Sequence, residues 1–301
     1  MGSGTIRNRA RRLIATLALA LAAIFSGPAA AWGEFGHRTT ADIALANVTP
    51  GTRASIARLI AYERRLGTPD CKLRSLQDAA VWPDCVRREG WRWGFTAAWH
   101  YRTAPICEPY NARSNCSGGN CVTGQIERNH RILADESLPP NVRLEALAFL
   151  VHFIGDVHMP LHSGDKDDRG GNDRVTSYGI VPGLNLHSIW DSPLAERAIT
   201  SARPSLVRKY STAERAELGG GDAAEWGRES WQLARDFVYP GAFDQDVCAG
   251  DLPMAAALSQ EDIVAAIPVS QRRITQAGLR MAAMLDEAFA SGPLAIRERR
   301  E

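Results

Sequence analysis

The sequence lacks an apolar run long enough to cross a bilayer. The run from Leu13 to Phe25 falls short of the roughly 20 residues that a membrane-spanning helix needs. Four arginines precede it and Pro-Ala-Ala-Ala (28–31) follows it, which is the pattern of a secretory signal with a small-residue cleavage site. The sequence therefore predicts a signal peptide at 1–31 and a mature domain at 32–301. The mature protein is expected in the periplasm or outside the cell, without stable membrane association.

A basic excess is also missing. Cleavage after Ala31 removes four arginines and no acidic side chain, which leaves 31 Lys and Arg against 34 Asp and Glu, a charge of about −3. Proteins that bind duplex nucleic acid through its phosphates usually carry a basic face. A substrate that contains phosphate must therefore be attracted locally, for instance by bound metal.

The six cysteines contain no C-x-x-C pair. After an export signal, an even number of cysteines favours three disulfides over thiolate metal ligands. No Pro/Ser-rich linker or internal repeat divides the mature chain, which is long enough for one large core or two modest ones. We expect a single domain.

Alternating strand patterns are scarce, so the sequence predicts an all-α, mostly helical fold. The predicted helices cover 38–66, with a break at Pro50, and then 141–158 and 274–289. Two irregular segments are expected, a loop cross-linked by disulfides over 104–124 and a glycine-rich loop over 163–185. The second is a candidate rim of an active site.

Histidine and aspartate recur four residues apart. His152 and Asp156 would share one helix face, and His187 and Asp191 repeat the spacing. One such pair alone is more often a solvated pair than a metal site. His152 and Asp156, however, lie in a strongly apolar stretch, where unpaired polar groups are costly. With His162, the pairs offer imidazole and carboxylate ligands, which suit zinc.

Three other signals are weak when taken alone. Asp84 and Arg87 stand three apart, and the simplest interpretation is an N-cap-like aspartate at a turn. His100 lies between aromatic residues and has the pattern of a core histidine. Cleavage would also free the amine of Trp32, which with its own carbonyl can chelate a metal, and His37 is close enough to join it.

In this order, the motifs resemble those of the S1/P1 family of zinc-dependent single-strand nucleases, which is related to bacterial zinc phospholipase C. The motifs are WGEFGH, VWPDCVR, WHY, LVHFIGDVHMPLH, GGN and NLHSIWD. The resemblance implies a single mostly helical domain with a trinuclear zinc cleft, in a bacterial member of the family. It also implies an endonuclease that cleaves single-stranded RNA and DNA to 5′-phosphate products and has 3′-nucleotidase activity on 3′-nucleotides.

The resemblance assigns nine residues as ligands of three zinc ions. One zinc would be held by Asp84, His100, His152 and Asp156. A second would be held by the amine and carbonyl of Trp32, by His37 and by the shared Asp156. The third would be held by His162, His187 and Asp191. His130 and His158 receive no role and are expected to be surface or packing residues.

The implied catalytic residues are Asp84, Asp156 and Arg87. The two aspartates would hold the metals that activate water, and Arg87 would stabilise charge on the phosphoryl oxygens. Tyr101 occupies the position of an aromatic that stacks on a base, and Asn172 of the GGN motif is an implied substrate contact. Fungal members have Asp where this chain has Thr103, so their base-edge contact is not carried over.

The resemblance also implies the disulfides Cys71–Cys85, Cys107–Cys248 and Cys116–Cys121. We expect a monomer. Two other functions stay open. A zinc phospholipase C is disfavoured by Asp191, where the phospholipases place Glu, and by the GGN motif. A non-catalytic zinc-binding protein is disfavoured by the shared carboxylate and the terminal ligand.

Overall fold

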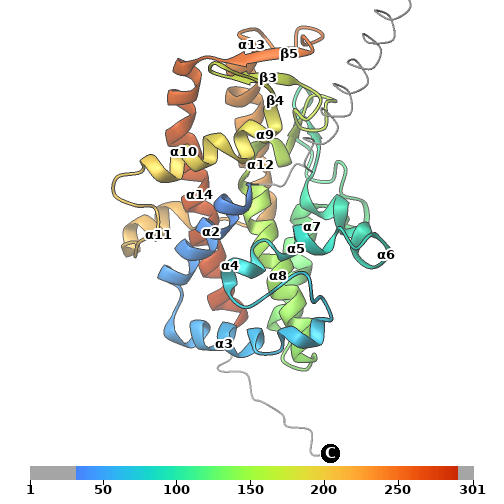
Figure 1. Cartoon of the computed structure of the whole chain (residues 1–301), viewed down its shortest axis with the longest axis vertical. Helices are drawn as coiled ribbons and strands as arrows, with labels where there is room; N and C mark the ends of the chain where they lie inside the picture. Colours follow the sequence, from blue (N-terminus) through green and yellow to red (C-terminus); the bar gives the residue numbers. More distant parts are fainter. Residues whose placement is uncertain (1–31, 291–301) are drawn as a thin grey trace, which may run out of the picture.

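The computed structural model describes residues 32–290. The predicted signal peptide, 1–31, therefore lies outside the described residues. Helices dominate the molecule, as predicted (Figure 1). The helices are α2 (Glu34–Asn47), α3 (Pro50–Ile60), η1 (Glu63–Leu66), α4 (Leu76–Ala79), α5 (Trp82–Val86), α6 (Gly90–Trp93), η2 (Gly94–His100), η3 (Ser117–Gly119), α7 (Val122–Ala134), α8 (Pro140–His158), η4 (Pro160–His162), α9 (Leu186–Asp191), α10 (Pro193–Ser201), α11 (Thr212–Leu218), α12 (Ala223–Leu233), η5 (Ala234–Val238), α13 (Tyr239–Phe243) and α14 (Gln260–Ala288).

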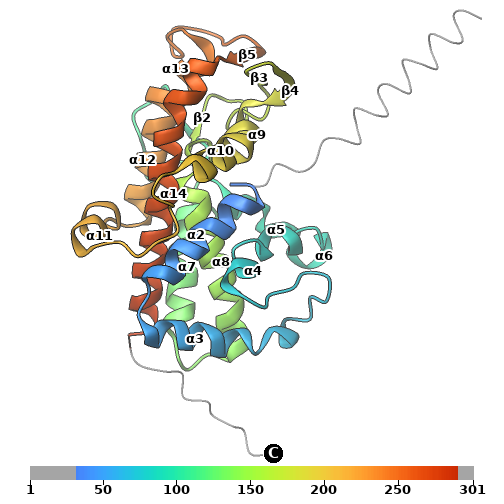
Figure 2. The same cartoon turned by 60° about the vertical axis from the view of Figure 1, so that its left-hand side comes forward.

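Helix α8 is the central helix of the fold. Pro140 occupies its first turn, where a missing amide hydrogen is harmless, and Pro160 follows its end. Nearly every residue from Leu144 to His158 is buried. A helix that is apolar on all sides belongs inside a protein, and α7, α14, α2, α4 and α5 pack around this one (Figures 1 and 2).

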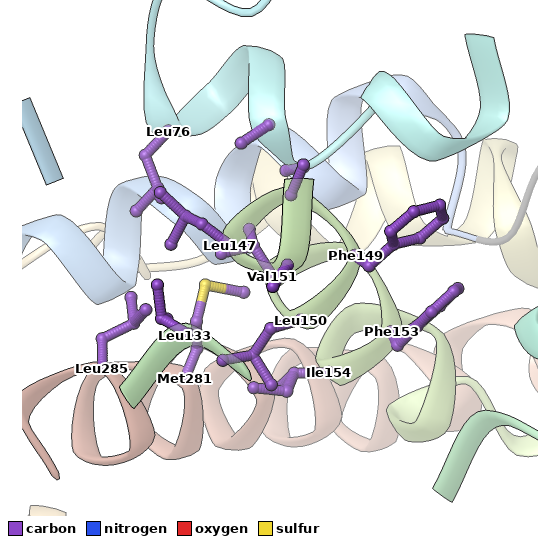
Figure 3. Packing of buried hydrophobic residues seen from close by; sticks show 14 of the residues in the cluster. Leu76, Leu133, Leu147, Phe149, Leu150, Val151, Phe153, Ile154, Met281 and Leu285 are labelled. Carbon is purple, nitrogen blue, oxygen red and sulfur yellow. The ribbon is translucent and has the colours of Figure 1, made fainter. Parts of the chain in front are cut away.

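The side chains of α8 pack in more than one direction (Figure 3). Leu150 and Ile154 point toward Met281 of α14, while Phe149 and Phe153 project from another side of the helix. The aromatic rings of Phe149 and Phe153 stack on each other, with centroids 5.4 Å apart, and both contact Trp99. The packing fixes the rotation of α8 about its axis and so the direction in which its polar residues point.

The buried hydrophobic residues form two clusters. The first surrounds α8 and takes side chains from α2, α3, α4, α7 and the last part of α14. The second joins α9, α10, α12, α13 and the first part of α14, and it includes Trp32 and Trp190. Val157 belongs to the first cluster and Met159 to the second. The histidine-rich segment 152–162 therefore runs along the boundary between the two clusters.

Two short sheets correct the expectation of irregular structure. The strands are β1 (Ala104–Pro105), β2 (Gly164–Asp165), β3 (Val175–Tyr178), β4 (Val181–Asn185) and β5 (Ala255–Leu258). Strands β1 and β2 are parallel, and β3 pairs antiparallel with β4 and parallel with β5. The loop prediction for 163–185 was therefore wrong over β2, β3 and β4, and that for 104–124 over β1. These strands pair largely with distant partners, which no local pattern reveals.

Helix α14 is longer than predicted. It begins at Gln260, where Ser259 and Asp262 form a capping box, and it continues through Pro268. The apolar stripe from Ile274 marks only its second half. Buried residues lie on both sides of the proline, among them Ala266 before it and Ile274 after it, and α2, α8 and α10 pack against the helix, so tertiary packing outweighs the local penalty.

The structure contains the disulfides Cys71–Cys85, Cys107–Cys248 and Cys116–Cys121, which are the pairs implied by the resemblance. The bridge at Cys85 ties α5 to the segment before α4, and Cys116–Cys121 closes the loop before α7. Within residues 32–290, no helix is both long and apolar enough to cross a membrane.

Candidate metal centre

Eight of the nine predicted metal ligands lie in three groups of side chains. In each group the potential ligand atoms lie within 4.8 Å of one another. The groups are His37, His152 and Asp156; Asp84, His100 and His152; and His162, His187 and Asp191. These residues come from α2, α5, η2, α8, η4 and α9, so the fold collects them from segments far apart in sequence.

Asp156 lies between the first two groups and is fully buried. Its Oδ2 atom is 3.1 Å from Nδ1 of His100 and 3.2 Å from Nε2 of His152. Its Oδ1 atom is 3.2 Å from Nε2 of His37. The two oxygens of one carboxylate therefore face two different sets of imidazole nitrogens, which is the arrangement that a bridging ligand requires.

Three imidazole rings are oriented by backbone carbonyls. Nδ1–H of His152 donates to Ala80 at 2.7 Å, Nδ1–H of His162 donates to His100 at 2.7 Å, and Nδ1–H of His187 donates to Gly170 at 2.8 Å. A carbonyl can only accept, so these bonds place the proton on Nδ1 and turn Nε2 toward its group. Metal-binding histidines are commonly held in this way.

Buried polar atoms that make no hydrogen bond are the test of whether a metal fits these groups. Among the described residues, buried atoms without a hydrogen-bond partner include Nε2 of His37 and His162, Oδ1 of Asp84 and Asp156, and both carboxylate oxygens of Asp191. Burying such atoms unpaired is unfavourable. Metal ions bound in the three groups would offset this cost, and nitrogen and carboxylate donors together suit zinc.

The electrostatic environment keeps the carboxylates of the first two groups charged. Burial alone would raise the pKa of Asp156, but His152, His100 and His37 hold it well below its usual range. Burial alone would lower the pKa of His152, but Asp156 and Asp84 raise it to about 9. Burial lowers the pKa of His162 to about 3 and thus keeps it in the neutral form that binds metal.

Asp84 and His100 lie together in the second group. Asp84 is inside α5 rather than at its N-cap, which is Val81, so the N-cap interpretation was wrong. Nδ1 of His100 is 3.7 Å from Oδ1 of Asp84 and 3.1 Å from Asp156. Nη2 of Arg87 is 3.2 Å from the same oxygen of Asp84. The guanidinium group thus borders the cluster of ligands.

Trp32 lies at the start of the described chain with its side chain fully buried. The amide of Gly33 donates to the carbonyl of Asp191 at 2.7 Å, which ties this segment to the third group. A side chain at Gly155 would place its Cβ 2.5 Å from Nδ1 of His37. Sequence reasoning missed Gly155, although its position next to Asp156 was a signal that the backbone of α8 is closely approached there.

A model of the S1/P1 nuclease family matches residues 32–290. The chain belongs to the S1/P1 nuclease family. The match begins at Trp32, the residue predicted to open the mature chain. Membership confirms the predicted class of enzyme, a nuclease that hydrolyses phosphodiester bonds, together with the mostly helical fold.

Sequence similarity to relatives in this nuclease family extends over most of the chain. Nuclease S1 of Aspergillus oryzae is 28% identical over 300 residues, which cover 93% of this chain and 98% of that protein. Endonuclease 3 of Arabidopsis thaliana is 29% identical over 277 residues, covering 86% and 90%. Nuclease P1 of Penicillium citrinum is 33% identical over 173 residues, covering 56% and 60%.

The two expected substrate contacts of this family member occupy different surroundings. Tyr101 is 42% exposed and lines a cavity of about 320 Å³ with Thr103, Asn115 and Asn120 among its other walls. Asn172 lies in the loop before β3, where its side-chain amide donates to the carbonyl of Arg169 at 2.9 Å. The described contact of Asn172 is therefore to its own loop.

The two histidines without a family role, His158 and His130, pack against other parts of the protein. Nδ1–H of His158 donates to the carbonyl of Ile154, and its Nε2 accepts from Arg280. Nε2 of His130 lies 3.2 Å from the carbonyl of Met284.

Two aspartates that the sequence analysis did not single out support His187. Oδ1 of Asp165 accepts from the amide of Gly170 at 2.7 Å, and Oδ1 of Asp168 accepts from Gly171 at 2.8 Å. The carbonyl of Gly170 in turn accepts from Nδ1 of His187. Gly170 has φ of 61°, and a Cβ there would lie 2.2 Å from the carbonyl oxygen of Leu161. In the sequence, the two adjacent glycines of the GGN motif were the signal that could have indicated this support.

Asp168→Asn should loosen this support and weaken the third metal site. Asp168 also accepts from Tyr239 and, through Oδ2, from Nε of Arg174 at 2.8 Å, a charge-assisted bond that an amide cannot replace. We expect the affinity of one metal ion to fall about 10- to 100-fold. The measurement is metal per protein during titration of limiting zinc. Asp173→Asn, in the same loop but paired with Arg169 at the surface, should leave the titration unchanged.

Proposed function

We propose that this protein is a zinc-dependent endonuclease that cleaves single-stranded RNA and DNA, leaves 5′ phosphates and removes the phosphate of 3′-nucleotides. The observation that carries the proposal is the convergence of buried histidine nitrogens and aspartate oxygens, several of which make no hydrogen bond, in three adjoining groups. Membership of a nuclease family and relatives named nuclease S1 and nuclease P1 support it.

Three zinc ions would be held by the residues that the resemblance assigns. Asp84, His100 and His152 would hold one ion, and His37 with the amine and carbonyl of Trp32 would hold a second. Asp156 would be shared by these two, consistent with its two oxygens facing both sets. His162, His187 and Asp191 would hold the third. Bound zinc would supply Lewis acidity, which neutralises phosphate charge and activates water near neutral pH.

The protein's own residues would bind and orient the substrate. Arg87 is held beside Asp84 by a contact of 3.2 Å, so its guanidinium is placed to stabilise charge on phosphoryl oxygens next to the metal ligands. Tyr101 directly follows His100, so a base stacked on its exposed ring would bring the neighbouring phosphate toward the metal ligands. Such stacking contributes about 1–3 kcal/mol per base.

The preference for single strands follows from the same geometry. Tyr101, which lines a cavity with Thr103, Asn115 and Asn120, can stack only on a base that has left the duplex stack, because neighbouring bases cover both faces of a base inside a duplex. The mature chain has about three more acidic than basic side chains, so it offers a duplex no general electrostatic attraction. We further propose that residues 1–31 direct export to the periplasm or the exterior, where the three disulfides would be stable.

Metal removal tests the proposal. Dialysis of the mature chain against a chelator should abolish cleavage of single-stranded DNA, and added zinc should restore it. Each zinc site occupied at 100 times its dissociation constant stabilises the fold by about 2.7 kcal/mol, so the melting temperature should fall with the metal. The measurements are zinc per protein, cleavage of single- and double-stranded DNA, and thermal melting with and without zinc.

Three results would count against the nuclease. Full cleavage after complete removal of zinc would contradict metal dependence, and equal cleavage of single- and double-stranded DNA would contradict the strand preference. Hydrolysis of phosphatidylcholine vesicles without action on denatured DNA would identify a phospholipase C. Tight binding of zinc with no turnover of any of these substrates would identify a non-catalytic zinc-binding protein.

A further inference from the structure

Exposed aromatic side chains gather in the stretch of sequence that ends beside the metal ligand His100. Over residues 32–290, four aromatic side chains are exposed, and three of them fall within an eleven-residue stretch: Trp91 (88%), Phe95 (64%) and Tyr101 (42%). Clustered exposure of this kind marks a binding surface more often than scattered single residues do.

Phe95 and Tyr101 are connected through helix η2. This is a 3₁₀ helix, in which residues three apart lie on the same edge, so Phe95 and Ala98 share one edge, and Tyr101 follows directly after the end of the helix. Ala98 and Tyr101 line the same cavity. The five steps from Phe95 to His100, at a rise of about 2.0 Å each, span roughly 10 Å along the helix, and Tyr101 directly follows it. This exceeds one base step, about 3.4 Å, so a nucleotide bound at Tyr101 does not reach Phe95.

The ring of Phe95 packs against the ring of Trp99. The two rings meet edge to face with centroids 5.2 Å apart. Trp99 is itself fixed, because its Nε1–H donates to Oδ1 of Asn120 at 2.8 Å and its ring packs on Phe149 and Phe153. The exposed ring is therefore held in place before any ligand arrives, which lowers the entropic cost of binding.

A cation lies beside this aromatic pair. The guanidinium group of Arg128, from α7, is 5.6 Å from the ring centroid of Trp99, and the Arg128 side chain is exposed. An aromatic face next to an arginine matches the alternating bases and phosphates of a single strand. Asn120, which accepts the hydrogen bond from Trp99, also lines the Tyr101 cavity, so this surface adjoins the cavity and a strand that leaves it on this side would meet Phe95 next.

We propose that Phe95, Trp99 and Arg128 form a second binding site for single-stranded nucleic acid, here called the Phe95 platform. Phe95 would stack on a base some distance from the cleaved phosphate, and Arg128 would contact a backbone phosphate. The platform rests on the proposed nuclease function and adds to it a preference for longer strands over short ones.

Phe95→Ala tests the platform by substrate length. The variant should lower kcat/KM about tenfold on a long single-stranded oligodeoxynucleotide and leave kcat/KM on a dinucleotide unchanged. Phe95→Trp should retain activity on both. Val264→Ala, at an exposed apolar residue of α14, is the matched control and should change neither.

Arg128→Ala gives an independent measurement. Loss of one phosphate contact should reduce the slope of log affinity against log salt by about 0.7 for a long single strand. An unchanged slope would contradict the phosphate contact.

The outcomes distinguish failure of the Phe95 platform from failure of the proposed nuclease function. Suppose that the unmodified protein cleaves single strands. If Phe95→Ala then leaves kcat/KM unchanged on both substrate lengths, or lowers it equally on both, the platform is wrong and the nuclease stands. If the unmodified protein cleaves neither length, the nuclease itself fails. Unchanged cleavage combined with weaker binding to phosphatidylcholine vesicles would instead assign Phe95 to a lipid surface.

Discussion

Asp156→Asn is expected to reduce cleavage of single-stranded DNA far more than loss of a supporting residue, which costs about 10- to 100-fold. The carboxylate is fully buried and its two oxygens lie 3.1–3.2 Å from nitrogens of three histidines. An amide has nearly the same shape but carries no charge and has one oxygen, so it cannot serve two metal ions. We therefore expect two zinc sites to weaken together while the third keeps its affinity.

The measurement combines zinc per protein with kcat/KM, and circular dichroism checks that the variant is folded. Asp236→Asn, at a half-exposed carboxylate of η5 beside Arg235, provides the same chemical change away from the metal centre and should leave both values unaltered. Retention of three zinc ions and full activity in Asp156→Asn would show that Asp156 is not the shared ligand.

A mature chain that retains Ala31 before Trp32 is expected to bind one zinc ion fewer and to lose more than about 100-fold in activity. The added residue converts a free amine, which can donate a lone pair, into an amide, which cannot. Trp32 is buried, and the hydrogen bond that the Gly33 amide donates to the Asp191 carbonyl anchors the segment, so the terminus has little freedom to move another donor into place. Correct cleavage would thus be part of assembling the site.

Zinc per protein and cleavage rate are again the measurements. A chain extended by one alanine after Glu301 is the control, since it adds the same residue far from Trp32 in sequence and should behave as the unextended protein does. An N-terminally extended chain with three zinc ions and full activity would exclude the terminal amine as a ligand, while leaving the other eight assignments intact.

Local sequence patterns reached part of the metal centre without any structure. The four-residue spacing of His152 and Asp156, and of His187 and Asp191, places each pair on one helix face because of the helical period. The apolar run around His152 showed that this pair is buried. In contrast, Asp84 and His100 looked like a capping residue and a core histidine, and only the order of motifs shared with a nuclease family pointed to them.

The sequence by itself determined the cysteine content. It also determined the helical character and the two histidine–aspartate pairs, because these depend on residues within a turn or two of one another. The tertiary structure alone decided that Asp156 faces two groups, that Gly155 admits the ring of His37, and that Asp165 and Asp168 support His187. It also fixed Trp99, which supports Phe95, by packing its ring on Phe149 and Phe153 of α8. Such contacts join segments distant in the chain, and they exist only once packing around α8 has fixed where each helix lies.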